Sequence, residues 1–257
     1  MKFEETIKII NRKYPITPDT GIILGSGLGE FTDSMEECIS ISYNDLPGYP
    51  LSTIPGHAGE FILGNIGNKP VVCARGRFHH YEGYEINTIT LPIDIFHALG
   101  CKNVVISNAA GCINKSWNPG ELMLITKMID FTFRGTTKPI IIENQVIDKN
   151  MKKTAIDIAK TSEITLHEGT YTWTLGPSYE TPSEIHMIKN IFGDAVGMST
   201  LPEINKAISY GMKILGLSCL SNYAAGINPD PLTHKEVLEV VQSAKHSFNT
   251  IISKVIS

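Results

Sequence analysis

The sequence predicts an α/β fold, and two observations support this prediction. Short apolar segments rich in β-branched residues alternate with segments of helical periodicity along the chain, which is typical of a sheet covered by helices. The 257 residues, 42% of them hydrophobic and 19% charged, are enough for one large globular domain with its own core. Because the chain has no internal repeat, low-complexity tract or linker, we expect a single domain over residues 1–257.

Helices are predicted where apolar residues recur at every third or fourth position. In residues 2–13 this stripe is formed by Phe3, Ile7 and Ile10, and Pro15 follows as a stop signal. Later helices are expected at residues 87–99, 149–160, 183–192, 203–210 and 234–252. A proline, a glycine or a capping-box pair marks one end of several of them.

Strands are predicted where short apolar runs stand between turn residues. These runs are residues 21–25, 61–66, 69–74, 103–107, 122–126, 170–175, 195–198 and 213–218. Residues 45–60 are rich in proline and glycine, so we expect a loop there. Residues 131–150 show the weakest pattern in the chain.

Charge and cysteine content restrict the partners and the location. The net charge of −4 provides no basic field for nucleic acid. The five cysteines are scattered and lack a metal-binding spacing, which suits free thiols in a reducing cytoplasm. The N-terminus lacks the apolar core of a signal peptide, and no apolar run is long enough for a membrane span. We therefore expect a cytoplasmic protein that binds neither nucleic acid nor membranes.

The first predicted strand runs into a glycine-rich turn, Gly25-Ser26-Gly27-Leu28-Gly29. Glycines let the backbone approach a ligand closely, and successive N–H groups can form an anion-binding nest. Ser26 adds a hydroxyl donor. The spacing does not match the dinucleotide-binding fingerprint, and a plain tight turn is the alternative.

A second candidate site follows the strand at residues 69–74. Two of the four arginines of the chain, Arg75 and Arg77, lie here beside His79 and His80. A guanidinium holds a tetrahedral oxyanion through two parallel hydrogen bonds, and a nearby imidazole adds a donor. The alternative is a surface cluster of ion pairs. His57, at the end of the loop before, is either a ligand contact or a surface or packing histidine.

Polar residues or glycines follow most of the predicted strands. If the sheet is largely parallel, these strand ends meet at one edge. The side chains brought together would supply an anion grip, one carboxylate, one amide, and an aromatic and thioether surface: Ser26, Arg77, His79, Ser199, Glu180, Asn222, Tyr81, Tyr179 and Met198. The chain has no nucleophile elbow, metal-ligand spacing or Walker lysine. This combination suggests that the bound anion is itself the nucleophile.

Six stretches together resemble the trimeric purine nucleoside phosphorylases over roughly residues 20–235. They are ILGSGLG at 23–29, GRFHHYEGY at 76–84, SNAAG at 107–111, GPSYET at 176–181, AVGMSTLPE at 195–203 and NYAAG at 222–226. The resemblance implies a single α/β domain whose twisted central mixed sheet is partly closed like a barrel and flanked by helices. It also implies a homotrimer that needs no cofactor or metal, with inorganic phosphate as a co-substrate.

The resemblance also implies a role for each site residue. Phosphate would be held by Ser26, His57, Arg77, His79, the backbone of Ala109, and Ser199. The ribose would contact Tyr81, Met198 and His234, and the purine would contact Tyr179, Glu180 and Asn222. Catalysis would depend on Asn222, His79 and Glu180.

The implied reaction is the reversible phosphorolysis of 6-oxopurine ribonucleosides and deoxyribonucleosides, such as inosine and guanosine, in purine salvage. The products would be the free base and (deoxy)ribose 1-phosphate. One alternative is a methylthioadenosine phosphorylase, which would favour an aspartate in place of Asn222 and a smaller residue in place of His234. The other is a non-catalytic module that binds a nucleotide or anion.

One segment departs from the family pattern, and four residues have a structural alternative. Residues 134–150 do not match the loop that carries a phenylalanine into a neighbour's ribose site, and they form a shorter segment. Glu180 could cap the following helix, and Asn222 could be a turn residue. Met198 could belong to the core, and His234 could be a first-turn helix residue.

Overall fold

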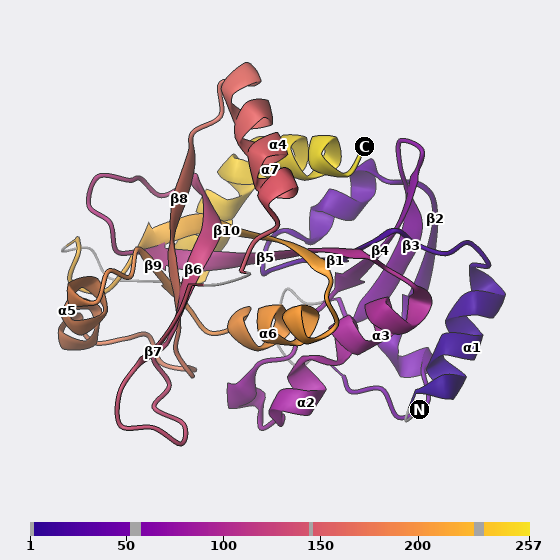
Figure 1. Ribbon diagram of the computed structural model, residues 1–257, viewed down its shortest axis with the longest axis horizontal. Helices are drawn as coiled ribbons and strands as arrows, with labels where there is room; N and C mark the ends of the chain where they lie inside the picture. The colour runs from indigo at the N-terminus through magenta and orange to yellow at the C-terminus, as the bar shows by residue number, and fades with distance from the viewer. Residues whose placement is uncertain (1–2, 52–57, 144–145, 229–233) are drawn as a thin grey trace.

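The computed structural model describes residues 3–51, 58–143, 146–228 and 234–257. Within these ranges ten strands form one mixed sheet (Figure 1). They are β1 (Thr20–Ile23), β2 (Glu36–Ser42), β3 (Glu60–Ile66), β4 (Lys69–Arg75), β5 (Asn103–Cys112), β6 (Leu122–Asp130), β7 (Ile140–Ile142), β8 (Leu166–Trp173), β9 (Ala195–Gly197) and β10 (Lys213–Tyr223).

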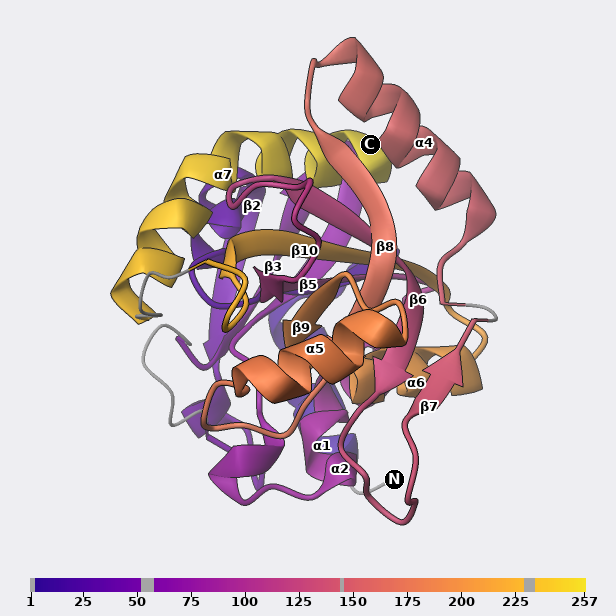
Figure 2. The same ribbon diagram turned by 90° about the vertical axis from the view of Figure 1, so that its left-hand side faces the viewer.

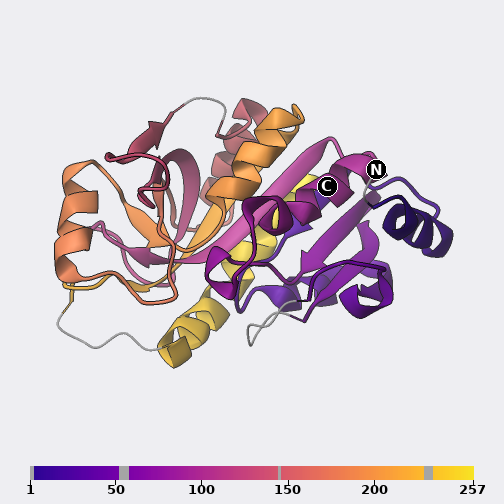
Figure 3. The same cartoon turned by 90° about the horizontal axis from the view of Figure 1, so that it is seen from below.

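The sheet has an open part and a closed part that share β5. In the open part β1 lies between β4 and β5 and is parallel to both, while β3 and β2 continue the sheet as antiparallel strands. In the closed part β5 pairs with β10, β10 with β6, β6 with β8, β8 with β9, and β9 with β5 again. This ring of five strands confirms the expected α/β fold with a mixed sheet partly closed like a barrel. Figure 3 shows the two parts beside each other.

The helices cover both faces of the sheet (Figures 1 and 2). They are α1 (Glu4–Lys13), α2 (Ile86–Ile89), α3 (Leu91–Leu99), α4 (Lys149–Thr161), α5 (Pro182–Asn190), α6 (Leu201–Ser209) and α7 (His234–Ile256), with 3₁₀ turns η1 (Gly29–Ser34), η2 (Tyr43–Asp45) and η3 (His80–Glu82). No helix in the described ranges combines the length and apolar character needed to cross a lipid bilayer.

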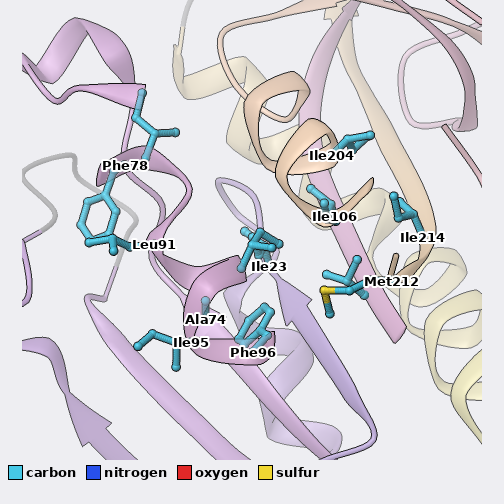
Figure 4. Close-up of a cluster of buried hydrophobic side chains, with 14 of the residues drawn as sticks. Ile23, Ala74, Phe78, Leu91, Ile95, Phe96, Ile106, Ile204, Met212 and Ile214 are labelled. Carbon is cyan, nitrogen blue, oxygen red and sulfur yellow. The ribbon is translucent and has the colours of Figure 1, made fainter. Parts of the chain in front are cut away.

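The core follows from the alternation of side chains along the central strands. Val104 and Ile106 of β5 face the cluster that includes α1, α3 and α6, whereas Val105 faces the cluster beneath α4 and α7. Figure 4 shows Ile23 and Ile106 from two neighbouring strands on the first of these sides. Because both faces of β1, β4 and β5 are buried over most of their length, the central residues of these strands are mostly apolar.

Several predicted elements have different boundaries in the structure. The helix expected at residues 87–99 is two helices, because Pro92 cannot donate an N–H and interrupts the ladder between α2 and α3. Strand β2 and the short β7 were not predicted. β7 pairs antiparallel with the end of β6, within the segment whose pattern was weakest.

Strands β5 and β10 are longer than predicted. They pair in parallel from Asn103 and Lys213 to Cys112 and Tyr223. Residues 108–111 and 221–222 therefore lie within strands, and not beyond their ends as expected. These residues lack the apolar pattern that predicts a strand, because several of them face a pocket and not an apolar core.

A buried ion pair connects α6 to the sheet. Arg77 Nε and Nη2 donate to the two carboxylate oxygens of Glu203, at 2.8 Å and 2.9 Å, and the two side chains are 2% and 0% exposed. Arg77 Nη1 donates to the carbonyl of Ser107 in β5 at 2.8 Å. One guanidinium therefore holds together the segment after β4, strand β5 and the first turn of α6.

Replacing Glu203 with alanine should strongly destabilise the fold. The substitution removes a bidentate carboxylate from a buried guanidinium, which typically costs about 3–5 kcal/mol of unfolding free energy. Urea unfolding followed by circular dichroism measures the loss. Glu143→Ala is the matched control, since it breaks the exposed ion pair with Lys127 and should change the stability far less. Equal losses of unfolding free energy for the two substitutions would show that the buried pair stabilises the fold no more than an exposed pair does.

Candidate functional site

One pocket, with a volume of about 140 Å³, collects ten of the twelve predicted site residues. They are Ser26, Arg77, His79, Ala109, Ser199, Tyr81, Met198, Tyr179, Glu180 and Asn222. His57 lies outside the described residues. His234 begins α7, and its side chain is not described. The pocket is also lined by Asn108, Gly111, Val196, Gly197, Ser221, Ala224 and Val237.

The topology explains why these residues meet. Ser26 follows β1 and Arg77 follows β4, and these two strands are parallel neighbours. Ala109 and Asn222 lie within the paired strands β5 and β10, opposite Cys219 and Gly111 respectively. Met198 directly follows β9, which closes the ring beside β5. The pocket thus lies where the open part of the sheet meets the closed part.

A β-bulge sets the direction of Asn222. Leu220 pairs with Ala110 and Asn222 pairs with Gly111, so Ser221 is an extra residue in β10. Neighbouring residues of β5 point to opposite sides, and their partners in β10 do the same. The bulge therefore lets Leu220 enter the core while Asn222 faces the pocket. Asn222 lies within a strand, so the alternative that it is a turn residue is wrong.

At the anion end of the pocket, Arg77 is buried and not part of a surface cluster. Its Nε and Nη2 donate to the Glu203 carboxylate in the parallel two-bond arrangement that was expected for a bound anion. Glu203 thus holds the guanidinium in one orientation beside the pocket. Arg75 instead forms a partly exposed ion pair with Glu60 at 3.3 Å.

His79 is oriented by Glu82, a carboxylate that is not among the predicted site residues. Glu82 Oε1 accepts a hydrogen bond from the backbone N–H of His79 at 2.7 Å and lies 3.1 Å from its Nδ1. Because a carboxylate accepts, this contact favours the proton on Nδ1. The imidazole also stacks on Tyr81, with ring centroids 4.8 Å apart. The spacing of His79 and Glu82 matches a capping box, which is the signal that could have identified Glu82.

Ser199 is positioned by a strained turn. Thr200, which is fully buried, has φ 76° and ψ −49°, and the Leu201 N–H donates to the Ser199 carbonyl at 2.8 Å. This is a γ-turn of the strained kind, which costs on the order of 1–3 kcal/mol. Asn108 Nδ2 donates to the Thr200 hydroxyl at 2.9 Å and helps to hold the turn. Asn108 Oδ1 is buried without a hydrogen-bond partner in the described residues, so it can accept from a ligand.

At the opposite end of the pocket are Tyr179, Glu180 and Asn222. Burial raises the pKa of the Glu180 carboxyl above its ordinary value, although hydrogen bonds from Thr174 and its own backbone oppose the rise. Glu180 does not cap α5, because Thr181 is the N-cap and forms a capping box with Glu184. The alternative reading of Glu180 as a cap is therefore wrong.

The amide of Asn222 is oriented by its neighbours. The Ser221 hydroxyl donates to Asn222 Oδ1 at 2.8 Å, and Asn222 Nδ2 donates to the Tyr223 carbonyl at 2.9 Å. An amide nitrogen carries two N–H donors, so a second one is available for a ligand. Met198 lines the pocket beside these groups, so it is not simply a core residue. Burial raises the pKa of Tyr81 to about 12, which keeps its hydroxyl protonated.

Comparison with known proteins identifies the family. The sequence model of the Phosphorylase superfamily matches residues 19–257. Purine nucleoside phosphorylase 1 of Geobacillus stearothermophilus is 40% identical, over 98% of this chain and 96% of that protein. Purine nucleoside phosphorylase of Mus musculus is 33% identical, over 98% and 92%.

A crystal structure of Schistosoma mansoni purine nucleoside phosphorylase with inosine superposes with a TM-score of 0.90. Its sequence is 30% identical, and the match covers 99% of this chain and 95% of that one. The order of six motifs, the ring of five strands and these relatives all agree. The chain therefore belongs to the purine nucleoside phosphorylase family of the phosphorylase superfamily.

Proposed function

We propose that this protein catalyses the reversible phosphorolysis of 6-oxopurine ribonucleosides and deoxyribonucleosides, as a step in purine salvage. One observation carries the proposal: a single pocket holds an anion-binding end with Arg77, His79 and Ser199, and a polar end with Glu180 and Asn222. Relatives named purine nucleoside phosphorylase support it. So do Schistosoma enzyme structures that contain hypoxanthine, inosine or guanosine.

Phosphate is the nucleophile in the proposed reaction. Ser26, Arg77, His79, the Ala109 backbone and Ser199 hold it below C1′ of the sugar, and His57 completes this group. The bond from C1′ to N9 breaks towards an oxocarbenium-like state, and its electron pair moves onto the purine, which takes a proton from solvent water. A phosphate oxygen then bonds to C1′. The products are the free base and (deoxy)ribose 1-phosphate, and no metal or cofactor takes part.

Asn222 and Glu180 stabilise the departing base. The second N–H of Asn222 donates to the purine near N7 and O6, where negative charge develops as the bond breaks. A preorganised donor of this kind contributes about 3 kcal/mol in the transition state. Ionised Glu180 accepts from N1–H, a proton that 6-oxopurines carry and adenine lacks. Tyr179 contacts the purine face, while Tyr81, Met198 and His234 contact the ribose.

We propose a cytoplasmic homotrimer as the working form. The hairpin of β6 and β7 carries an apolar surface made of Phe133, Ile140 and Ile141, which are 40%, 46% and 55% exposed. This hairpin projects from the body of the molecule (Figure 2). It replaces the longer loop expected from the family pattern. Large exposed apolar residues grouped in this way are typical of protein interfaces.

Inosine should be cleaved only when phosphate or arsenate is present. In the proposed reaction the bound anion is the nucleophile, so cleavage should stop when no such anion is supplied. Hypoxanthine release, followed by ultraviolet absorbance, measures the rate in each buffer. Equal rates in phosphate-free buffer would indicate a hydrolase, and binding without cleavage in any buffer would indicate a non-catalytic module.

Asn222→Asp should shift the base preference from inosine towards adenosine. The aspartate replaces a donor to O6 with an acceptor for a 6-amino group. In the wild type, adenosine leaves two polar contacts mismatched at about 1–3 kcal/mol each, so inosine should be preferred by about 30-fold or more. The measurement is kcat/KM for both nucleosides with both proteins. An unchanged ratio would show that Asn222 does not contact the base.

Light scattering should give a mass about three times the 28.2 kDa of one chain. Ile141→Lys places a charge on the exposed hairpin and should lower this mass. Ile16→Lys is the matched control, because Ile16 is 49% exposed outside the hairpin. A monomeric wild type, or equal effects of the two substitutions, would count against the hairpin as an interface.

A further inference from the structure

Thr174 is a buried polar residue that contacts the candidate base-binding carboxylate without lining the pocket. It directly follows β8 and is 8% exposed. Its hydroxyl donates to Glu180 Oε1 at 2.6 Å, whereas its other acceptor, the Gly197 carbonyl, is 3.4 Å away. Its backbone N–H donates to the same carbonyl at 2.9 Å. The hydroxyl is therefore fixed on the strand framework behind Glu180.

The contact matters because Glu180 has two requirements in the proposed reaction. It must present one oxygen to the purine N1–H, and it must be ionised in order to accept that proton. Burial raises the pKa of Glu180, and the Thr174 hydroxyl and the Glu180 backbone N–H lower it. Two other titratable groups face it: Glu184, on the first turn of α5, raises its pKa further, and Tyr179 is its neighbour in the chain.

We propose that Thr174 is a positioning residue for base recognition: its hydroxyl occupies Oε1 of Glu180, so that Oε2 of a charged carboxylate faces the purine. The inference rests on the proposed function of the site. Thr174 acts through Glu180 and touches no substrate atom. A hydrogen bond from a hydroxyl to a carboxylate stabilises the charged form.

The same contact affects the choice between purines. A protonated carboxyl carries an O–H donor, which would meet the N1 acceptor of adenine and clash with the N1–H of hypoxanthine. By keeping Glu180 charged, Thr174 favours 6-oxopurines. Without its hydroxyl, the discrimination against adenosine should weaken most at low pH.

The test is Thr174→Val, which removes the hydroxyl and keeps the side-chain shape. The pKa of Glu180 should rise further, so the carboxylate ionises only at higher pH. At saturating phosphate, the acid limb of kcat/KM for inosine should move to higher pH. At neutral pH kcat/KM should fall by about tenfold or more, and the ratio of inosine to adenosine activity should fall with it.

Two controls separate this role from general packing. Thr174→Ser keeps the hydroxyl and should retain the wild-type acid limb, whereas Thr174→Ala, of similar size, should show the shift. Thr172→Val removes a fully buried hydroxyl on β8 that has no hydrogen-bond partner in the described part of the chain. It should leave the pH profile unchanged.

Each outcome bears on one of the two proposals. Coincident acid limbs for wild type and Thr174→Val, or for the serine and alanine variants, would overturn the role of Thr174. A uniform loss at every pH would also overturn it, since it would indicate packing alone. Absence of phosphate-dependent cleavage by the wild type at any pH would instead refute the proposed function.

Discussion

The ion pair between Arg77 and Glu203 is the interaction on which the site most depends. It spans 126 residues of sequence and joins the segment after β4 to the start of α6. The same network reaches the glycine-rich turn, because Ser107 accepts from the Gly25 N–H and donates to the Ile23 carbonyl. Buried charges tolerate little displacement from their partners. The open and closed parts of the sheet are therefore held in one relative position where the pocket forms.

Much of the fold and most of the candidate site could be predicted from the sequence. The strand predicted at residues 69–74 is buried on both faces over residues 71–74, so its apolar run is easy to identify. Site residues such as Ser26 and Glu180 stand in local motifs beside glycine or proline, which mark turns at strand ends. The residues of the anion end and of the polar end could therefore be predicted from the sequence. The distance between the two ends could not.

The parts that could not be predicted depend on tertiary pairing. The extension of β10 to Tyr223 is stabilised by its pairing with β5, and its own residues carry no apolar alternation. Glu203 is an ordinary first-turn acid until Arg77 is placed beside it. Thr174 resembles any strand threonine, because only the folded chain shows that its hydroxyl meets Glu180.

The bulge at Ser221 makes the site sensitive to the length of the chain as well as to the identity of its residues. Side chains alternate along β10, so the extra residue offsets everything that follows it by one position. Deleting Ser221 would remove the bulge and leave Leu220 opposite Ala110 and Asn222 opposite Gly111, whereas deleting an earlier residue of β10 would turn every side chain between the deletion and Ser221 to the other face of the sheet. A single-residue deletion at the bulge therefore keeps the amide in the pocket, whereas the same deletion earlier in the strand moves core side chains of β10 to the wrong face of the sheet.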